Sequence, residues 1–268
     1  MTQGQTTRFG PWVLAAASVR GPVHVRKEMP NQDAWAAGAG GDGIALAAAV
    51  ADGHGARIHA RSDVGARLAT GAALACLAAP GSAADLPSRI AATWRELVLA
   101  HRAENPMDEM DDWTEDEAEL TLAYGTTLIA AQLRDNALLA LQIGDGNLLV
   151  GLPDGTIRAP LPDDDGIEGE ATHSMCEPQA AARFRLAQLG AGDGAAPDFL
   201  MMSTDGVGKS FASAADLAGV ARHFREQARA GRIDQIAASL PDWLANVAAR
   251  GAGDDATLLL AYLDQTTG

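Results

Sequence analysis

Three apolar runs in this sequence lead directly into an aspartate that is followed by glycine. They read AAAVADGHG, LALQIGDGN and FLMMSTDGV, and their aspartates are Asp52, Asp145 and Asp205. Apolar runs of this length predict β-strands. The glycine lets the backbone bend tightly and lets a carbonyl group or a ligand come close. The pattern therefore places three carboxylates at the ends of strands.

Two further acids belong to the pattern, because Asp254 precedes an apolar run and Asp33 follows an Asn-Gln pair. Taken singly, each Asp-Gly pair is a common turn sequence. Four or five carboxylates that met in one cleft would repel one another unless cations were bound between them. Oxygen ligands without an accompanying set of His or Cys favour Mg²⁺ or Mn²⁺ over zinc.

The periodicity of the rest of the chain predicts a mixed fold. Apolar runs of strand length cover residues 12–18, 44–51, 126–133, 137–143, 147–152, 199–203 and 257–263. Helical periodicity covers residues 62–79, 85–104, 216–230 and 233–250, with Pro241 as a candidate interruption of the last helix. Strands in runs of two or three, with helix pairs between them, predict an α+β sandwich of antiparallel sheets covered by helices rather than a βαβ array.

The length and charge of the chain limit its function. The 268 residues are enough for one large domain, and we expect a single domain over residues 1–268. Twenty basic and 35 acidic residues give a net charge of -15, which disfavours nucleic acid and membrane surfaces as partners. The same charge would repel a phosphorylated substrate, so an enzyme that acts on phosphate esters would need local cations.

The cysteines and the N-terminal sequence indicate a cytoplasmic location. Cys76 and Cys176 are the only cysteines, and they lack the spacing of a disulfide framework or a zinc site. A reducing compartment fits this usage. Residues 12–19 weakly resemble a signal peptide, but the stretch is too short for a spanning helix and we interpret it as the first strand.

Two polar stretches predict loops. Residues 104–119 are read as an acidic surface loop or capping strip, with substrate selection as the alternative. Residues 153–177 are typical of the long loops that flank active sites.

Five motifs resemble, in the same order, those of the metal-dependent (PPM) or type 2C protein phosphatases. VADGHGA is similar to the family's V-x-D-G-H-G-G, GTTLIAAQL to its G-[ST]-T strand, QIGDGN to G-D-S-R, MMSTDGV to L-x-S-D-G, and GDDAT to D-N-x-T. The resemblance covers residues 15–263 and includes features of a bacterial branch. It implies a four-layer αββα sandwich of two antiparallel sheets flanked by helices, and hydrolysis of phosphoserine or phosphothreonine.

The resemblance also implies a pair of Mn²⁺ or Mg²⁺ ions. Asp52 would bridge the two cations, and Gly53 would offer its carbonyl oxygen. Asp205 and Asp254 would each complete one side of the pair. Asp145, together with Asp205, would hold a third and weaker cation.

Two other residues would act on water and on the substrate. By resemblance, Asp33 would hold metal-bound water and His54 would protonate the leaving seryl or threonyl oxygen. Water that bridges two cations has a lowered pKa and attacks phosphorus in line, so no phosphoenzyme is required. Outside this motif His54 would be interpreted as an ordinary turn histidine.

The phosphate-binding segment departs from the family pattern. Family members usually place an arginine five residues before the aspartate at position 33, where this sequence has Glu28. In GPVHVRKEMPNQD, which resembles the bacterial branch, either His24 or Arg26 would bind phosphate. Both are also consistent with solvated loop residues that have no function. Further departures that remove no direct metal ligand are Gln32, Ala56, Asn147 and Asp255.

The function implied by the resemblance is that of a phosphatase whose partner is a phosphorylated protein substrate and which opposes a serine/threonine kinase. Two alternatives stay open at this point. One is a catalytically weak pseudophosphatase that binds phosphoproteins, and the other is a metal-dependent hydrolase of small phosphate esters.

Overall fold

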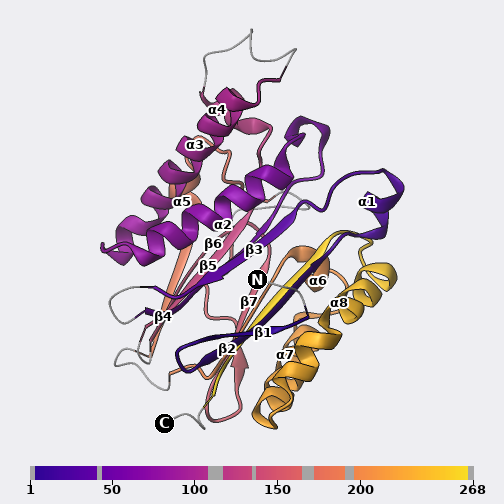
Figure 1. Cartoon of the computed structure of the whole chain (residues 1–268). Helices are drawn as coiled ribbons and strands as arrows, with labels where there is room; N and C mark the ends of the chain where they lie inside the picture. The colour runs from indigo at the N-terminus through magenta and orange to yellow at the C-terminus, as the bar shows by residue number, and fades with distance from the viewer. Residues whose placement is uncertain are drawn as a thin grey trace.

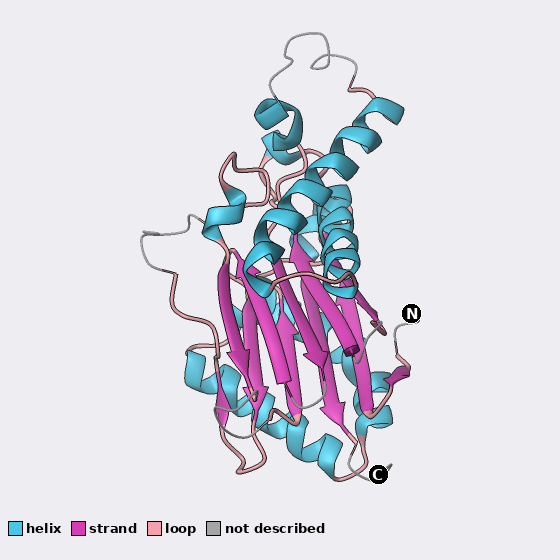
Figure 2. Cartoon of the chain, turned by 90° about the vertical axis from the view of Figure 1, so that its left-hand side faces the viewer, coloured by secondary structure: helices cyan, strands magenta, loops and turns pink. Residues whose placement is uncertain are grey.

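The computed structural model describes residues 4–40, 44–107, 117–134, 137–164, 172–190 and 196–264. Two antiparallel sheets pack face to face, and helices cover the outer face of each sheet (Figure 1). Figure 2 shows that the strands of both sheets lie roughly along one common axis. This arrangement is the expected four-layer αββα sandwich, so the predicted fold class is confirmed.

Both sheets are antiparallel between all neighbouring strands. The first sheet has the order β1 (Thr6–Phe9), β2 (Trp12–Val19), β11 (Ala256–Leu263), β10 (Phe199–Ser203), β7 (Asn147–Gly151) and β8 (Ile157–Arg158). The second sheet has the order β3 (Asp33–Gly38), β4 (Ile44–Asp52), β5 (Leu128–Arg134), β6 (Ala137–Ile143) and β9 (Arg185–Leu189).

The two long helix pairs lie on opposite outer faces. The second sheet is covered by α2 (Ser62–Ala78) and α3 (Leu86–Glu104), with the short α4 (Glu117–Leu122) and α5 (Ala180–Arg183) beside α3. The first sheet is covered by α7 (Ala214–Arg229) and α8 (Ile233–Arg250). The connections contain α1 (Pro22–Arg26), α6 (Asp205–Gly208) and the 3-10 turns η1 (Arg57–His59) and η2 (Ala83–Asp85). In the part of the chain that the structure describes, no helix has the length and apolarity needed to cross a bilayer.

Strand β4 shows why the strand sequences are continuously apolar. Ala47, Ala49 and Ala51 face the core beneath α2 and α3, whereas Leu46 and Val50 face the core between the two sheets. Successive side chains of a strand point to opposite faces. Because both faces of this sheet are covered, both sets of positions are apolar.

Some elements differ from the sequence-based expectation. Helix α8 continues through Pro241, because buried Leu240 and Leu244 on either side hold it against the first sheet and this packing outweighs the missing hydrogen bond. Strands β1, β3 and β9 were not predicted, since they are short or rich in small residues. In the first expected loop, residues 108–116 lie outside the described residues and 117–122 form α4. In the second, 165–171 lie outside them and 157–158 form β8.

Candidate functional site

Three of the predicted acids lie at the ends of strands, on the same side of the second sheet. Asp33 begins β3 and Asp52 ends β4, and the antiparallel register places the two residues opposite each other. Asp145 lies in the turn that follows β6. Because β4 and β6 both pair with β5 in antiparallel fashion, they end at the same edge of the sheet.

The first sheet brings two more acids to the same region. Strand β10 ends at Ser203, and Asp205 follows in the first turn of α6. Asp254 precedes β11, whose first residues pair with the end of β10. Gly206 allows these two segments to approach, since a Cβ atom there would lie 1.9 Å from the carbonyl oxygen of Asp255. This glycine is therefore required by a close backbone contact.

The electrostatics of Asp52 show how closely the carboxylates gather. Burial raises the pKa of Asp52 well above its usual value, and the charges of Asp33, Asp205 and Asp254 raise it further. Burial also raises the pKa of Asp33, although a hydrogen bond from Thr204 opposes this effect. Carboxyl groups that disfavour one another's ionisation in this way form a site that is suited to cations.

A cavity of about 800 Å³ opens over these residues, and we call it the acidic cleft. The site residues of the sequence analysis that line it are Asp52, Gly53, His54, Asp145, Asp205 and Asp254. Gly53 packs tightly there, since a Cβ atom would lie 2.7 Å from the carbonyl oxygens of Gln32 and Ser62. The structure therefore brings together four of the five acids that the sequence pattern singled out, and the fifth, Asp33, lies beside Asp52 but outside the lining.

The donor atoms of the acidic cleft fit hard divalent cations. Asp33 is buried, and its Oδ2 accepts a hydrogen bond of 2.7 Å from Thr204 Oγ1. Its Oδ1 is also buried and has no hydrogen-bond partner among the described residues. An unpaired buried carboxylate oxygen next to further carboxylates is the kind of oxygen-rich environment that Mg²⁺ or Mn²⁺ occupies. Asp52, Asp205, Asp254 and the Gly53 carbonyl would supply the ligands.

His54 shares the acidic cleft with a second histidine that the sequence analysis did not single out. The rings of His54 and His59 have their centroids 4.9 Å apart. His59 Nδ1 lies 2.6 Å from the carbonyl oxygen of Leu122, which holds the ring in place. Burial lowers the pKa of His54 to about 4, and the charge of His59 adds to this effect against the opposing influence of acidic neighbours. His54 is therefore neutral near pH 7 in the metal-free chain.

Lys209 also lines the acidic cleft and was not predicted. Its ammonium group donates to the Asp205 carboxylate, and Nζ lies 3.3 Å from Oδ2 of Asp145. Burial alone would lower the pKa of Lys209, but the hydrogen bonds and charges of Asp205 and Asp145 hold it above its usual value. The spacing of four residues between Asp205 and Lys209, across the single turn of α6, was the available sequence signal.

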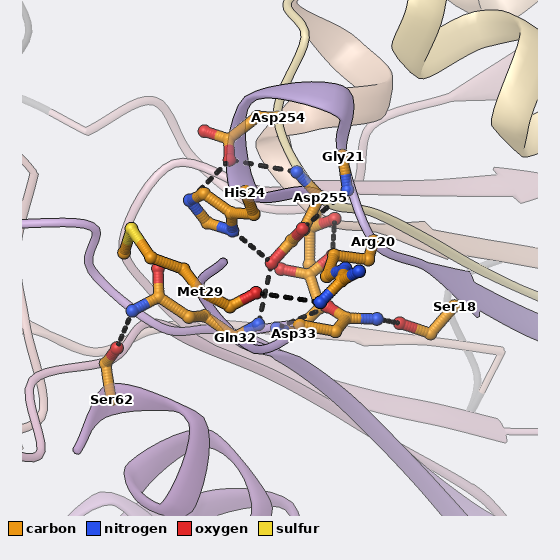
Figure 3. A network of polar contacts seen from close by, with 12 residues as sticks. Ser18, Arg20, Gly21, His24, Met29, Gln32, Asp33, Ser62, Asp254 and Asp255 are labelled. Carbon is orange, nitrogen blue, oxygen red and sulfur yellow. Dashed lines mark hydrogen bonds and ion pairs between the residues drawn. The ribbon is translucent and has the colours of Figure 1, made fainter. Parts of the chain in front are cut away.

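The two expected phosphate-binding residues lie outside the lining of the acidic cleft. His24 is buried, and its Nδ1 lies 2.8 Å from Oδ2 of Asp255 (Figure 3). Its Nε2 lies 3.6 Å from Oδ1 of Asp254. Arg26 is exposed at the end of α1. The geometry thus directs His24 toward the acidic pair before β11, and phosphate binding by His24 or Arg26 stays a prediction.

Asp255 is the centre of the network drawn in Figure 3. Its Oδ1 accepts a hydrogen bond of 2.7 Å from the Gly21 amide, and its Oδ2 accepts one of 2.6 Å from the Gln32 amide as well as contacting His24. His24, Asp254 and Asp255 offer ligand atoms within 4.8 Å of one another. However, the partners of Asp255 account for both of its oxygens, so this cluster is a structural support beside the acidic cleft.

Comparisons with known proteins agree with this geometry. The model of the family described as Protein phosphatase 2C matches residues 20–245. The manganese-bound catalytic domain of the serine/threonine phosphatase PstP is similar over 94% of this chain and 97% of its own, with 25% identity and a TM-score of 0.60. The PstP/Ppp structure from Mycobacterium tuberculosis is 24% identical over 95% of this chain and 99% of its own, with a TM-score of 0.59. PppA from Pseudomonas aeruginosa, described as a regulatory component of T6SS, is 20% identical over 96% of this chain and 99% of its own, with a TM-score of 0.58. No match was found among the curated proteins.

Proposed function

Because this chain belongs to the protein phosphatase 2C family, we propose that the acidic cleft is its catalytic centre, with Asp52, Asp205 and Asp254 as the principal metal ligands. The chain is a metal-dependent protein serine/threonine phosphatase, and its substrates are phosphorylated proteins. The alternatives of a non-catalytic binding module and of a hydrolase for small phosphate esters are not favoured.

One observation carries this assignment of residues. Carboxylates from two different sheets meet at one cavity, and the buried Asp33 beside them keeps an oxygen without a hydrogen-bond partner among the described residues. Divalent cations bound there would supply activation of water and neutralise charge on the phosphoryl oxygens. PstP was solved with two manganese ions, and we propose Mn²⁺ or Mg²⁺ for this chain.

The test is hydrolysis of a phosphothreonine peptide by the wild-type protein and by Asp52→Asn, with and without manganese. We expect the wild type to depend on manganese and Asp52→Asn to lose at least about 100-fold in kcat/KM, since a central metal ligand is removed. Asp85→Asn is the matched control, because Asp85 is exposed and does not line the acidic cleft. Activity that survives both chelation and Asp52→Asn would refute the assignment.

We further propose that His54 serves the leaving oxygen of the substrate. A neutral imidazole keeps one N–H group, with which it hydrogen-bonds that oxygen as the bond to phosphorus breaks. His54→Gln is expected to slow hydrolysis of a phosphothreonine peptide by about 100-fold and to affect p-nitrophenyl phosphate much less, because p-nitrophenolate leaves without proton assistance. Equal losses on both substrates would contradict this role.

The cellular context is also a proposal. We propose that the chain is one catalytic domain over residues 1–268, that it acts in the cytoplasm and that it opposes a serine/threonine kinase. Free, buried Cys76 and Cys176 support a reducing location. Comparison of protein phosphorylation in cells with and without this chain is expected to show phosphoserine and phosphothreonine sites that rise on its removal, and no change at such sites would contradict the kinase pairing.

A further inference from the structure

Lys209 joins acids from the two halves of the molecule. Asp205 lies at the start of α6, just after β10 of the first sheet, and Asp145 follows β6 of the second sheet. The Lys209 ammonium donates to Oδ2 of Asp205 and lies 3.3 Å from Oδ2 of Asp145. The other oxygen of Asp145 accepts a hydrogen bond of 3.1 Å from Thr172 Oγ1. Both oxygens of Asp145 therefore have partners within the protein.

We propose that Lys209 is a built-in cation of the acidic cleft, and that its ammonium takes the place between Asp145 and Asp205 where the family resemblance implies a third divalent ion. This inference rests on the proposed function, which assigns the other carboxylates to a metal pair. It limits the chain to two bound ions and makes Asp145 a partner of lysine.

Charge and chemistry support this role. An ammonium group that contacts two carboxylates neutralises much of their repulsion, and it repels a divalent ion from the same few ångströms. Among the residues that the structure describes, Lys209 is the only lysine or arginine that lines the acidic cleft. It is also one of only two lysines in the chain, the other being the exposed Lys27. A cation at this position is therefore a specific feature of a chain with a net charge of -15.

The first test counts the manganese ions bound by each chain, by calorimetry and by elemental analysis after gel filtration in manganese buffer. We expect two ions per wild-type chain and three per Lys209→Met chain, because the methionine keeps the approximate length of the side chain and leaves both carboxylates without the ammonium group. The third ion is expected to disappear again in the double variant Lys209→Met, Asp145→Asn. Lys27→Met, which alters the other lysine, is expected to bind two ions.

The second test needs no variant that could misfold. The rates of acetylation of Lys209 and Lys27 are compared by peptide mass spectrometry, in metal-free protein and at saturating Mg²⁺. The ion pairs are expected to slow acetylation of Lys209 several-fold relative to Lys27 in both conditions. If Mg²⁺ raised the rate at Lys209 to that at Lys27, the ion would have displaced the lysine and the inference would be overturned.

The remaining outcomes separate this inference from the proposed function. If the wild type bound two ions and Lys209→Met bound no more, the role of Lys209 would be overturned and the metal pair would stand. The same holds if the wild type bound three ions. A higher KM for phosphopeptide in Lys209→Met without a third ion would identify a phosphate ligand instead. A chain that bound no ions in any variant would overturn the proposed metal centre together with this inference.

Discussion

At the scale of single residues, Asp255, where the family motif has asparagine, contacts three residues of the distant segment 21–32. Its two oxygens contact the Gly21 amide, the Gln32 amide and the His24 ring. An asparagine, which the family motif has at this position, offers a single acceptor oxygen and could not accept from both backbone amides, which reach different oxygens of Asp255. His24 adds a third contact, because its Nδ1 lies 2.8 Å from Oδ2 of Asp255. Together these contacts hold the segment that carries Asp254.

We expect Asp255→Asn to weaken metal binding without removing a ligand. The variant leaves at least one of the buried partners unsatisfied, and loss of a support behind a metal ligand typically costs 10-fold to 100-fold in affinity. Calorimetric titration with manganese measures the effect. Asp154→Asn is the control, because Asp154 lies on an exposed turn away from the acidic cleft.

The proposed role of Asp255 also predicts how a substitution of His24 changes manganese binding. His24→Ala is expected to lower manganese affinity in the same direction, because the ring lies between Asp255 and Asp254. If both variants bound manganese as the wild type does, while melting at lower temperature, Asp255 would support the fold alone.

At the scale of elements, helix α2 is built from small residues so that it can lie close to its neighbours. Ala66, Ala69 and Ala73 are fully buried against the second sheet and α3. At Gly65 an added Cβ atom would lie 1.9 Å from the carbonyl oxygen of Tyr124. The residues after α4 lead through Tyr124 into β5, so this contact ties α2 to the strand that lies next to β4.

The glycines of α2 provide a matched pair of substitutions. Gly65→Ala forces the backbone near Tyr124 to move and is expected to lower the free energy of unfolding by about 1–3 kcal/mol, as overpacked sites do. Gly71→Ala in the same helix meets no atom within 4 Å and is expected to raise it by up to about 1 kcal/mol through helix propensity. Chemical denaturation of both variants checks the pair. Equal changes of the same sign would show that the contact with Tyr124 is not tight.

Across the whole molecule, the buried carboxyl groups of the acidic centre make the stability of the metal-free fold depend on pH. Burial and neighbouring carboxylates hold the pKa of Asp33 and Asp52 well above the usual value in the folded, metal-free chain. In the unfolded chain these groups ionise near pH 4. Between that pH and the higher folded pKa, the unfolded state has lost protons that the folded state keeps. Rising pH therefore favours unfolding across this window.

A pH series on metal-free protein tests this dependence of stability on pH. Asp52→Asn is expected to be more stable than the wild type at pH 8, by about 1.4 kcal/mol for each unit by which the pKa of Asp52 is raised, and the difference should shrink toward pH 4. Manganese at pH 8 should reverse the order, since only the wild type keeps the central ligand. Thermal unfolding at several pH values measures both effects. A difference that grew toward low pH would contradict the sign of the shift.

Much of the fold could be predicted because strand and helix patterns are local. The strand at 44–51 and the helix at 62–79 differ from β4 and α2 by a single residue at one end. Strand β3 was missed because Asp33–Gly38 is short and contains mostly small residues, although it carries one of the acids. Pro241 was expected as a candidate interruption, but tertiary packing overrides its local effect and α8 continues through it.

Local sequence patterns were enough to predict the kinds of residue that make up the candidate site. Asp-Gly pairs after apolar runs are short-range features, and they place carboxylates at strand ends whatever surrounds them. Which side chains meet depends on the packing of the whole fold. His24 contacts Asp255 across 231 positions of sequence, and Lys209 contacts Asp145 across 64. Such contacts depend on how two sheets pack, so the burial of His24 and the bridging position of Lys209 are visible only in the folded chain.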